Sequence, residues 1–244
     1  MSKSGEKKAI NFYIPSKGPE NWGELLVNKI EQFKSGHSAR TLACCWENQQ
    51  GFPSEVKSTF LDSNIELFKN VELLLGLPEY KVSLPGGSRA SQNDIFVLAK
   101  GLLHEKSEQL IAIAVEGKVN EDFGRTIGKR LGLAPSSGLR KRVQFLIETL
   151  GLERLSDADI SGLRYQLLHR SVSAILLAQK FTAPNALMLI HSFSESDKGF
   201  VDYEKFSFLF GLNAVKNQII GPIHLNDIDL YFGWVQGDQK FLSY

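Results

Sequence analysis

Cysteine is scarce in this chain. Only Cys44 and Cys45 are present, and they are adjacent, so they do not bridge each other in a relaxed geometry. Together with His37 they also lack the second pair of ligands that a structural zinc site needs. We therefore expect a cytoplasmic protein rather than a disulfide-stabilised secreted one.

Long apolar runs are missing as well. No stretch approaches the roughly 18 apolar residues that a membrane span requires. The charged start MSKSGEKK is not followed by the apolar segment of a secretory signal. We predict neither secretion nor membrane insertion, and no membrane partner.

Several enzyme motifs are absent too. The PGGS at 85–88 has neither the G-K-[ST] ending of a nucleotide loop nor the spacing of a dinucleotide fold, so we interpret it as a turn. The G-x-S-x-G signature of triad hydrolases does not occur.

An excess of charge is also missing, since the chain has 28 Lys and Arg residues and 27 Asp and Glu residues. Nucleic-acid binding would therefore need a local basic patch.

Two short apolar runs are present between Ser91 and Asn120, each of a length typical of a buried strand. Asp94 lies at the start of the first run, and Glu116 and Lys118 lie at the end of the second. Side chains alternate along a strand, so Glu116 and Lys118 share a face. If the two strands are neighbours, two carboxylates and one amine meet at one edge of the sheet.

This set of groups suits metal-assisted attack on a phosphodiester. Mg²⁺ prefers oxygen ligands and takes one or two carboxylates from a protein, which Asp94 and Glu116 would supply to Mg²⁺ or Mn²⁺. The ion would activate a water, and Lys118 would orient that water and offset the developing charge. The alternative is a cross-strand ion pair without catalytic function. The run before Glu116 is apolar on both faces, which favours a site at the end of a covered strand.

Asp94 followed by Glu116-Gly117-Lys118 at the end of an apolar strand resembles the PD-(D/E)XK nuclease superfamily. The segments PGGSRASQND, AVEGKV and RYQLLHR are similar to an uncharacterised bacterial family usually placed near that superfamily, from about Pro85 onward. One departure is Asn93, which stands where the motif has its proline. The resemblance implies a restriction-endonuclease-like α/β fold, with a mixed central sheet flanked by helices. It also implies a nucleic-acid partner, DNA ahead of RNA, and a possible homodimer.

The 244 residues suit one compact domain. We expect a helical N-terminal part over 1–78, packed on an α/β core over 79–244. Apolar spacing predicts helices over 19–36, 38–47, 53–61 and 65–75. A short strand is expected at 80–84. The resemblance would allow Glu66 or Glu72 to add a metal contact, whereas a solvent-facing glutamate is the ordinary alternative.

Basic residues gather after Lys118, where they could neutralise backbone phosphates. The alternative is a solvated helix face, because the apolar stripe of residues 139–150 turns Arg140 and Lys141 outward. Both interpretations stay open. The members of this cluster are Arg125, Lys129, Arg130, Arg140, Lys141 and Arg142.

A long helix is predicted over 157–180, with Gln166, His169, Arg170 and Ser173 on one face. The resemblance implies that this helix packs beside the active site, with Gln166 in the catalytic set and His169 and Arg170 in contact with nucleic acid. A structural histidine is the alternative for His169. We further expect a strand at 186–190 parallel to its neighbour, an aromatic-rich helix at 202–212, and a last strand at 230–238 whose aromatic side chains pack in the core.

Three functions remain open. The first is a metal-dependent phosphodiesterase acting on DNA or RNA. The second is a non-catalytic binding or regulatory protein that retains the nuclease-like fold, because a fold does not dictate an activity. The third is a sugar or small-phosphate enzyme that uses the same metal pair.

Overall fold

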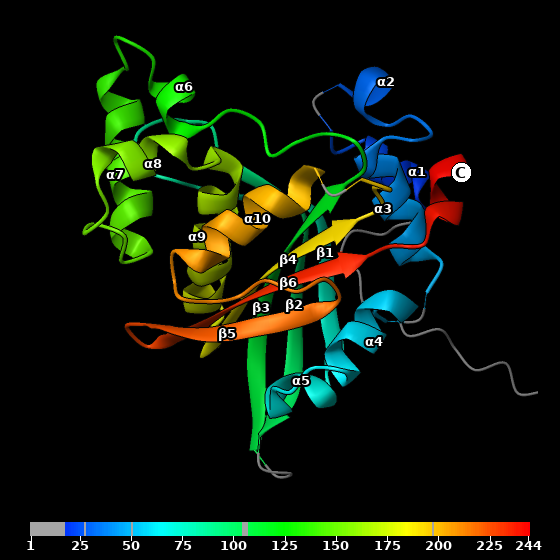
Figure 1. Cartoon of the computed structure of the whole chain (residues 1–244). Helices are drawn as coiled ribbons and strands as arrows, with labels where there is room; N and C mark the ends of the chain where they lie inside the picture. The colour runs from blue at the N-terminus through cyan, green and yellow to red at the C-terminus, as the bar shows by residue number, and fades with distance from the viewer. Residues whose placement is uncertain (1–17, 27, 50, 104–106, 197) are drawn as a thin grey trace, which may run out of the picture.

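The computed structural model has a sheet through the centre of the molecule, as Figure 1 shows. This mixed sheet has six strands in the order β1-β2-β3-β4-β6-β5. The structure describes residues 18–244 except positions 27, 50, 104–106 and 197. The antiparallel pairs are β1–β2, β2–β3 and β5–β6, and the parallel pairs are β3–β4 and β4–β6. The strands are β1 (Glu72–Val82), β2 (Ser91–Leu103), β3 (Ser107–Lys118), β4 (Asn185–Ser192), β5 (Gln218–Leu225) and β6 (Ile228–Gln236).

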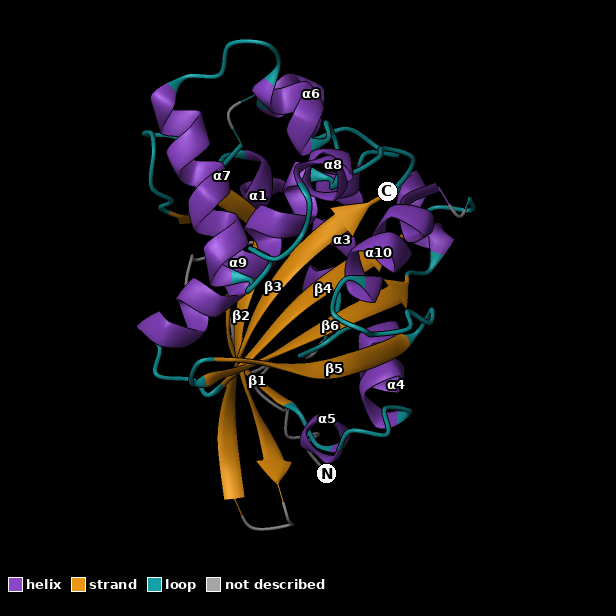
Figure 2. Cartoon of the chain, turned by 60° about the vertical axis from the view of Figure 1, so that its left-hand side comes forward, coloured by secondary structure: helices purple, strands orange, loops and turns teal. Residues whose placement is uncertain are grey.

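Helices cover both faces of the sheet, and α9 lies across β3 and β4 (Figure 2). The N-terminal helices lie on the opposite face. The helices are α1 (Glu20–Gly23), α2 (Lys29–Gln32), α3 (Ser38–Glu47), α4 (Ser54–Leu61), α5 (Glu66–Lys69), α6 (Ile127–Leu131), α7 (Ser137–Thr149), α8 (Asp157–Gly162), α9 (Tyr165–Lys180) and α10 (Lys198–Phe208), with a short 3₁₀ helix at Gln239–Ser243. The predicted α/β architecture of a mixed sheet between helices is confirmed.

The alternation of side chains along β2 and β3 explains these layers. Phe96 and Ala114 pack with α9 on one face, whereas Ile95 and Val97 pack with the N-terminal helices on the other. Each strand is therefore covered on both sides, which accounts for its continuous apolar sequence. All eight residues of β4 are buried for the same reason.

Several predicted elements lie where expected. The helices at 38–47 and 53–61 correspond to α3 and α4, and the strands at 186–190 and 230–238 correspond to β4 and β6. The tail aromatics Tyr231, Phe232 and Trp234 are buried, as predicted. Cys44 and Cys45 are both free and buried. In the described part of the chain, no helix is both long and apolar enough to cross a membrane.

The predicted helix over 19–36 is wrong, because α1 and α2 are two separate short turns. Asn28 leaves the helical conformation, and its side chain accepts a hydrogen bond from the Glu31 N–H. This cap starts a new helix, so a local hydrogen bond overrides the apolar spacing. Ile30, one of the apolar residues whose spacing predicted the longer helix, is 81% exposed.

The predicted helix over 65–75 is also wrong in its second half. It ends at Lys69, and the chain from Glu72 onward forms β1 instead. Leu73 pairs with Ala99 of β2, and such pairing along a neighbouring strand overrides helical propensity. The short strand expected at 80–84 is the end of β1, and the expected boundary at 78 falls inside that strand.

The predicted helix over 157–180 is divided into α8 and α9. Leu163 and Arg164 are extended, because the backbone there pairs with the loop after β3. The Leu163 carbonyl accepts from the Ile127 N–H at 2.8 Å, and the Tyr165 N–H donates to the Arg125 carbonyl at 3.2 Å. The last helix, α10, lies four residues earlier than the predicted 202–212 at each end.

Candidate active site

The pairing of β2 with β3 brings Asp94 beside Glu116. Ile95 pairs with Val115, and the two acids are the next residues along the paired strands. The Gly117 N–H donates to Asp94 Oδ2 at 2.7 Å. A Cβ at Gly117 would lie 3.3 Å from Asp94 Oδ2 and 3.2 Å from Leu42 Cδ2, so the absence of a side chain allows this close approach.

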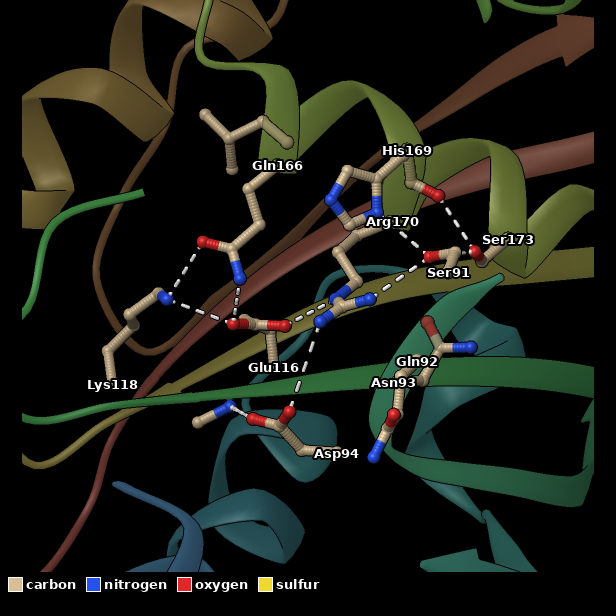
Figure 3. A network of polar contacts seen from close by, with 12 residues as sticks. Ser91, Gln92, Asn93, Asp94, Glu116, Lys118, Gln166, His169, Arg170 and Ser173 are labelled. Atoms are coloured by element: carbon tan, nitrogen blue, oxygen red, sulfur yellow. Dashed lines mark hydrogen bonds and ion pairs between the residues drawn. The ribbon is translucent and has the colours of Figure 1, made fainter. Parts of the chain in front are cut away.

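Lys118 and Gln166 complete the contacts of one Glu116 oxygen (Figure 3). Lys118 Nζ donates to Glu116 Oε1 at 2.9 Å and to Gln166 Oε1 at 3.0 Å. Gln166 Nε2 donates to the same Glu116 oxygen. Gln166 comes from the first turn of α9, which therefore fixes the position of the ammonium group.

Arg170, one turn further along α9, lies between the two acids. Its Nε donates to Glu116 Oε2, and its Nη2 lies 4.0 Å from Asp94 Oδ1. Glu116 and Arg170 are both buried. The guanidinium is therefore an internal counter-ion of the carboxylates, and its contact with nucleic acid, which the resemblance implies, stays a prediction.

The two acids differ in their proton affinity. Burial would raise the pKa of Glu116, but the charges of Arg170 and Lys118 outweigh burial and lower that pKa. Burial, followed by the negative charges of Glu116 and Glu79, raises the pKa of Asp94 well above its usual range. Asp94 therefore keeps its proton up to a higher pH than an exposed aspartate does. A divalent cation bound nearby would lower the pKa of Asp94 again.

Ser91 links β2 to α9. Its Oγ lies 2.8 Å from His169 Nδ1, and it accepts from Arg170 Nη1 at 3.0 Å and from Ser173 Oγ at 2.8 Å. Burial, followed by the charges of Arg170 and other cations, lowers the pKa of His169 well below its usual value. His169 is therefore neutral at physiological pH and cannot attract phosphate by charge.

Glu79 is a third acid that sequence reasoning missed. It lies in β1, is buried, and accepts from Gln92 Nε2 at 2.7 Å. Its φ of 52° is unusual for a residue with a side chain. An acid inside the otherwise apolar run ELLLGLPEYKV could have indicated this residue. The strand predicted from the sequence began only at Tyr80 and so did not include Glu79.

Glu79→Gln is expected to change the pH dependence of stability. Burial, opposed by the Gln92 hydrogen bond, raises the pKa of Glu79 from 4.5 to about 7. Folding favours the protonated form of Glu79. The contribution of Glu79 to the free energy of unfolding is therefore fully present below pH 4.5 and is lost as the pH rises through 7. The wild type should lose about 3 kcal/mol relative to the variant over that interval. Urea unfolding in EDTA at several pH values measures the free energy of unfolding of both proteins. If that free energy depends on pH in the same way for the wild type and the variant, the prediction is wrong.

The three acids, together with Lys118, Gln166 and Arg170, line a cleft of about 760 Å³. Asp94 retains 19% exposure of its side chain, so it is reachable from the cleft. The N-terminal part also lines the cleft, through Leu26, Gln32 and residues 36–39, and so do residues 120–122 and Gly124 after β3. The residues that the sequence selected and that line the cleft are Asp94, Glu116, Lys118, Gln166 and Arg170.

A family model described as "Domain of unknown function (DUF6946)" matches residues 15–239. The chain belongs to the DUF6946 family. No curated protein and no solved structure matched it.

The DUF6946 cleft holds two carboxylates of the type that a divalent cation takes, although both oxygens of Glu116 already accept from Lys118, Gln166 or Arg170. In the described part of the chain, no group of three or more His, Cys, Asp and Glu side chains could hold a metal. Asp94 uses Oδ2 for the Gly117 N–H, whereas Oδ1 is 4.0 Å from Arg170, beyond hydrogen-bond distance. Oxygen atoms of Asp94 and Glu116 are the ligand type that Mg²⁺ prefers, with water and substrate supplying the others.

The basic residues selected from the sequence are not all at the cleft. Arg125 lines a second pocket beside it. Lys129, Arg140 and Lys141 are exposed and outside the lining of both pockets. Glu66 and Glu72, considered as further metal contacts, are exposed as well, and Glu72 pairs with Lys100.

Proposed function

We propose that this chain is a metal-dependent phosphodiesterase that cleaves nucleic acid, on a restriction-endonuclease-like fold. The observation that carries the proposal is that Asp94, Glu116 and Lys118 meet in one cleft at the end of the β2–β3 pair. The substrate would be DNA ahead of RNA. A homodimer would allow both strands of a duplex to be cut.

Each side chain has a part in this proposal. Asp94 and Glu116 would hold Mg²⁺ or Mn²⁺. Such an ion, when bound, supplies polarisation of the phosphoryl group and a bound water of lowered pKa. Lys118 lies against Glu116 at 2.9 Å, where its ammonium can orient the attacking water and stabilise the charge that develops on phosphate oxygens. Gln166 holds that ammonium in place.

A non-catalytic protein with the same fold is the second candidate. It is favoured by Arg170, whose guanidinium already neutralises Glu116 without any metal. A cleft with its own counter-ion could bind a partner without turnover. The same binding and cleavage measurements separate the two candidates.

The test is a calorimetric titration of Mg²⁺ and Mn²⁺ into the purified protein, followed by incubation with plasmid, single-stranded DNA and RNA. Metal binding together with cleavage would support the phosphodiesterase. Binding of nucleic acid with neither metal binding nor cleavage would support the non-catalytic protein instead.

Lys118→Met is expected to keep metal binding and to lose cleavage. Methionine retains most of the length of the side chain but not its charge, and Glu116 keeps its contacts with Arg170 and Gln166. The rate of cleavage should fall about 10²- to 10³-fold, as for the loss of one electrostatic contact to the transition state. Calorimetry and a cleavage assay on linear DNA measure the two properties. A rate equal to that of the wild type would remove Lys118 from the reaction.

A further inference from the structure

A pocket of about 310 Å³ lies directly beside the acidic cleft, and Gly124 and Gln166 line both. We call it the arginine pocket. It is built by the turn before β2, the loop after β3 together with α6, and the inner faces of α7 and α9. The arginines that line it are Arg89, Arg125, Arg130 and Arg142.

The charge of this pocket is all of one sign. Its lining contains four arginines and neither aspartate nor glutamate, whereas the cleft next to it contains Glu79, Asp94 and Glu116. In the part of the chain that the structure describes, Arg89 and Arg125 make no side-chain hydrogen bond or ion pair, and Arg130 makes only a ring contact with Tyr165, at 4.2 Å. Three guanidinium groups are therefore available to an anion.

The fourth arginine gives the pocket a fixed wall. Arg142 is buried and donates to the carbonyl oxygens of Pro85, Leu84 and Gly87 at 2.9, 3.3 and 3.1 Å. These contacts hold the turn before β2 against α7. One wall of the pocket is thus fixed by buried contacts, whereas Arg89, Arg125 and Arg130 are exposed around it.

We propose that the arginine pocket binds the terminal phosphate monoester of a nucleic-acid strand, while the adjacent cleft acts on the nearest phosphodiester. This inference rests on the proposed function, and it assigns the substrate class as strand ends. Arginine presents a planar, permanently charged fork that matches phosphate oxygens.

Two features favour a terminal phosphate monoester over an internal phosphodiester as the ligand of the arginine pocket. A phosphate monoester carries about −1.5 to −2 charges at neutral pH, so it matches several unpaired arginines better than the single charge of a diester. The pocket also lies at the small end of the roughly 300–1,000 Å³ range of small-molecule sites, and Lys129, Arg140 and Lys141 lie outside its lining. The size and charge of the pocket suit one phosphate with its nucleoside.

The test measures binding in EDTA, so that cleavage plays no part. Fluorescence anisotropy compares three short single-stranded DNAs of one sequence, with a 5′-phosphate, with a 3′-phosphate, or with hydroxyl groups at both ends. All measurements use one salt concentration, because affinity depends on salt. The proteins are the wild type, Arg125→Gln/Arg130→Gln, and Arg154→Gln as a control at an exposed arginine outside both pockets.

We expect the wild type and the control to bind one phosphorylated end at least tenfold more tightly than the hydroxyl ends. The double variant should lose this preference but keep the weak binding of the hydroxyl form. Inorganic phosphate should compete for the phosphorylated DNA in the wild type. Equal binding of all three DNAs by the wild type, or an unchanged preference in the double variant, would overturn the inference. The proposed cleavage would be unaffected, since it is scored separately with metal present.

Discussion

Glu116→Gln is expected to abolish cleavage and to weaken Mg²⁺ or Mn²⁺ binding beyond detection. The substitution keeps the size of the side chain but replaces the carboxylate that, together with Asp94, would hold the cation in the cleft. Losing even an outer partner of a metal ligand costs about 10- to 100-fold in affinity, so the loss of a ligand should exceed that range. The rate of cleavage should fall by at least 10³-fold, since about 10²- to 10³-fold is typical for a single lost electrostatic contact.

Calorimetric titration and a cleavage assay on linear DNA measure both effects. Glu148→Gln, on the exposed side of α7, is the matched control and should behave as the wild type. Thermal unfolding of Glu116→Gln has to accompany the assay, because Arg170 and Lys118 lose their buried counter-charge. A folded Glu116→Gln that cleaves DNA at the rate of the control would exclude this site from catalysis.

Arg170→Gln is expected to produce the largest loss of stability. Removing one partner of a buried ion pair leaves the other charge uncompensated, at a cost of about 3–5 kcal/mol. Arg170 and Glu116 are both almost fully buried, so solvent screens little of this effect. Urea unfolding in EDTA measures the free energy of unfolding.

The same variant tests the metal proposal through stability alone. With the guanidinium gone, Glu116 and Asp94 lack their shared counter-ion, and a divalent cation that binds only the folded state should raise stability. We expect Mg²⁺ or Mn²⁺ to stabilise Arg170→Gln more than the wild type. Lys240→Gln, which breaks an exposed pair with Asp238, should show little loss and no such response. A variant that stays equally unstable with and without metal would favour a structural ion pair.

Several helices and strands of the fold could be predicted from the spacing of apolar and turn residues in the sequence. The helices at 38–47 and 53–61 and the buried strands β4 and β6 follow from apolar spacing and turn residues that lie close together in the chain. The sequence predicted that Asp94, Glu116 and Lys118 meet if the two apolar strands are neighbours, and the antiparallel pairing of β2 with β3 meets that condition.

Other features depended on contacts between distant segments. The chain at 72–75 became a strand because β2 was there to pair with it, and the division between α8 and α9 follows from backbone pairing with the loop after β3. Apolar spacing carries no information about either partner. For the same reason it could not show that Glu79 faces the cleft from a neighbouring strand.

The sequence by itself determined which groups of this protein are available for chemistry: two acids and a lysine at the ends of paired strands, and a polar face on the helix that follows. The tertiary structure alone decided what those groups do to one another. It placed Arg170 between the acids, and it gathered arginines from four segments into one pocket. Proton affinity and counter-ions depend on distances of a few ångströms between side chains far apart in the chain, and only packing sets those distances.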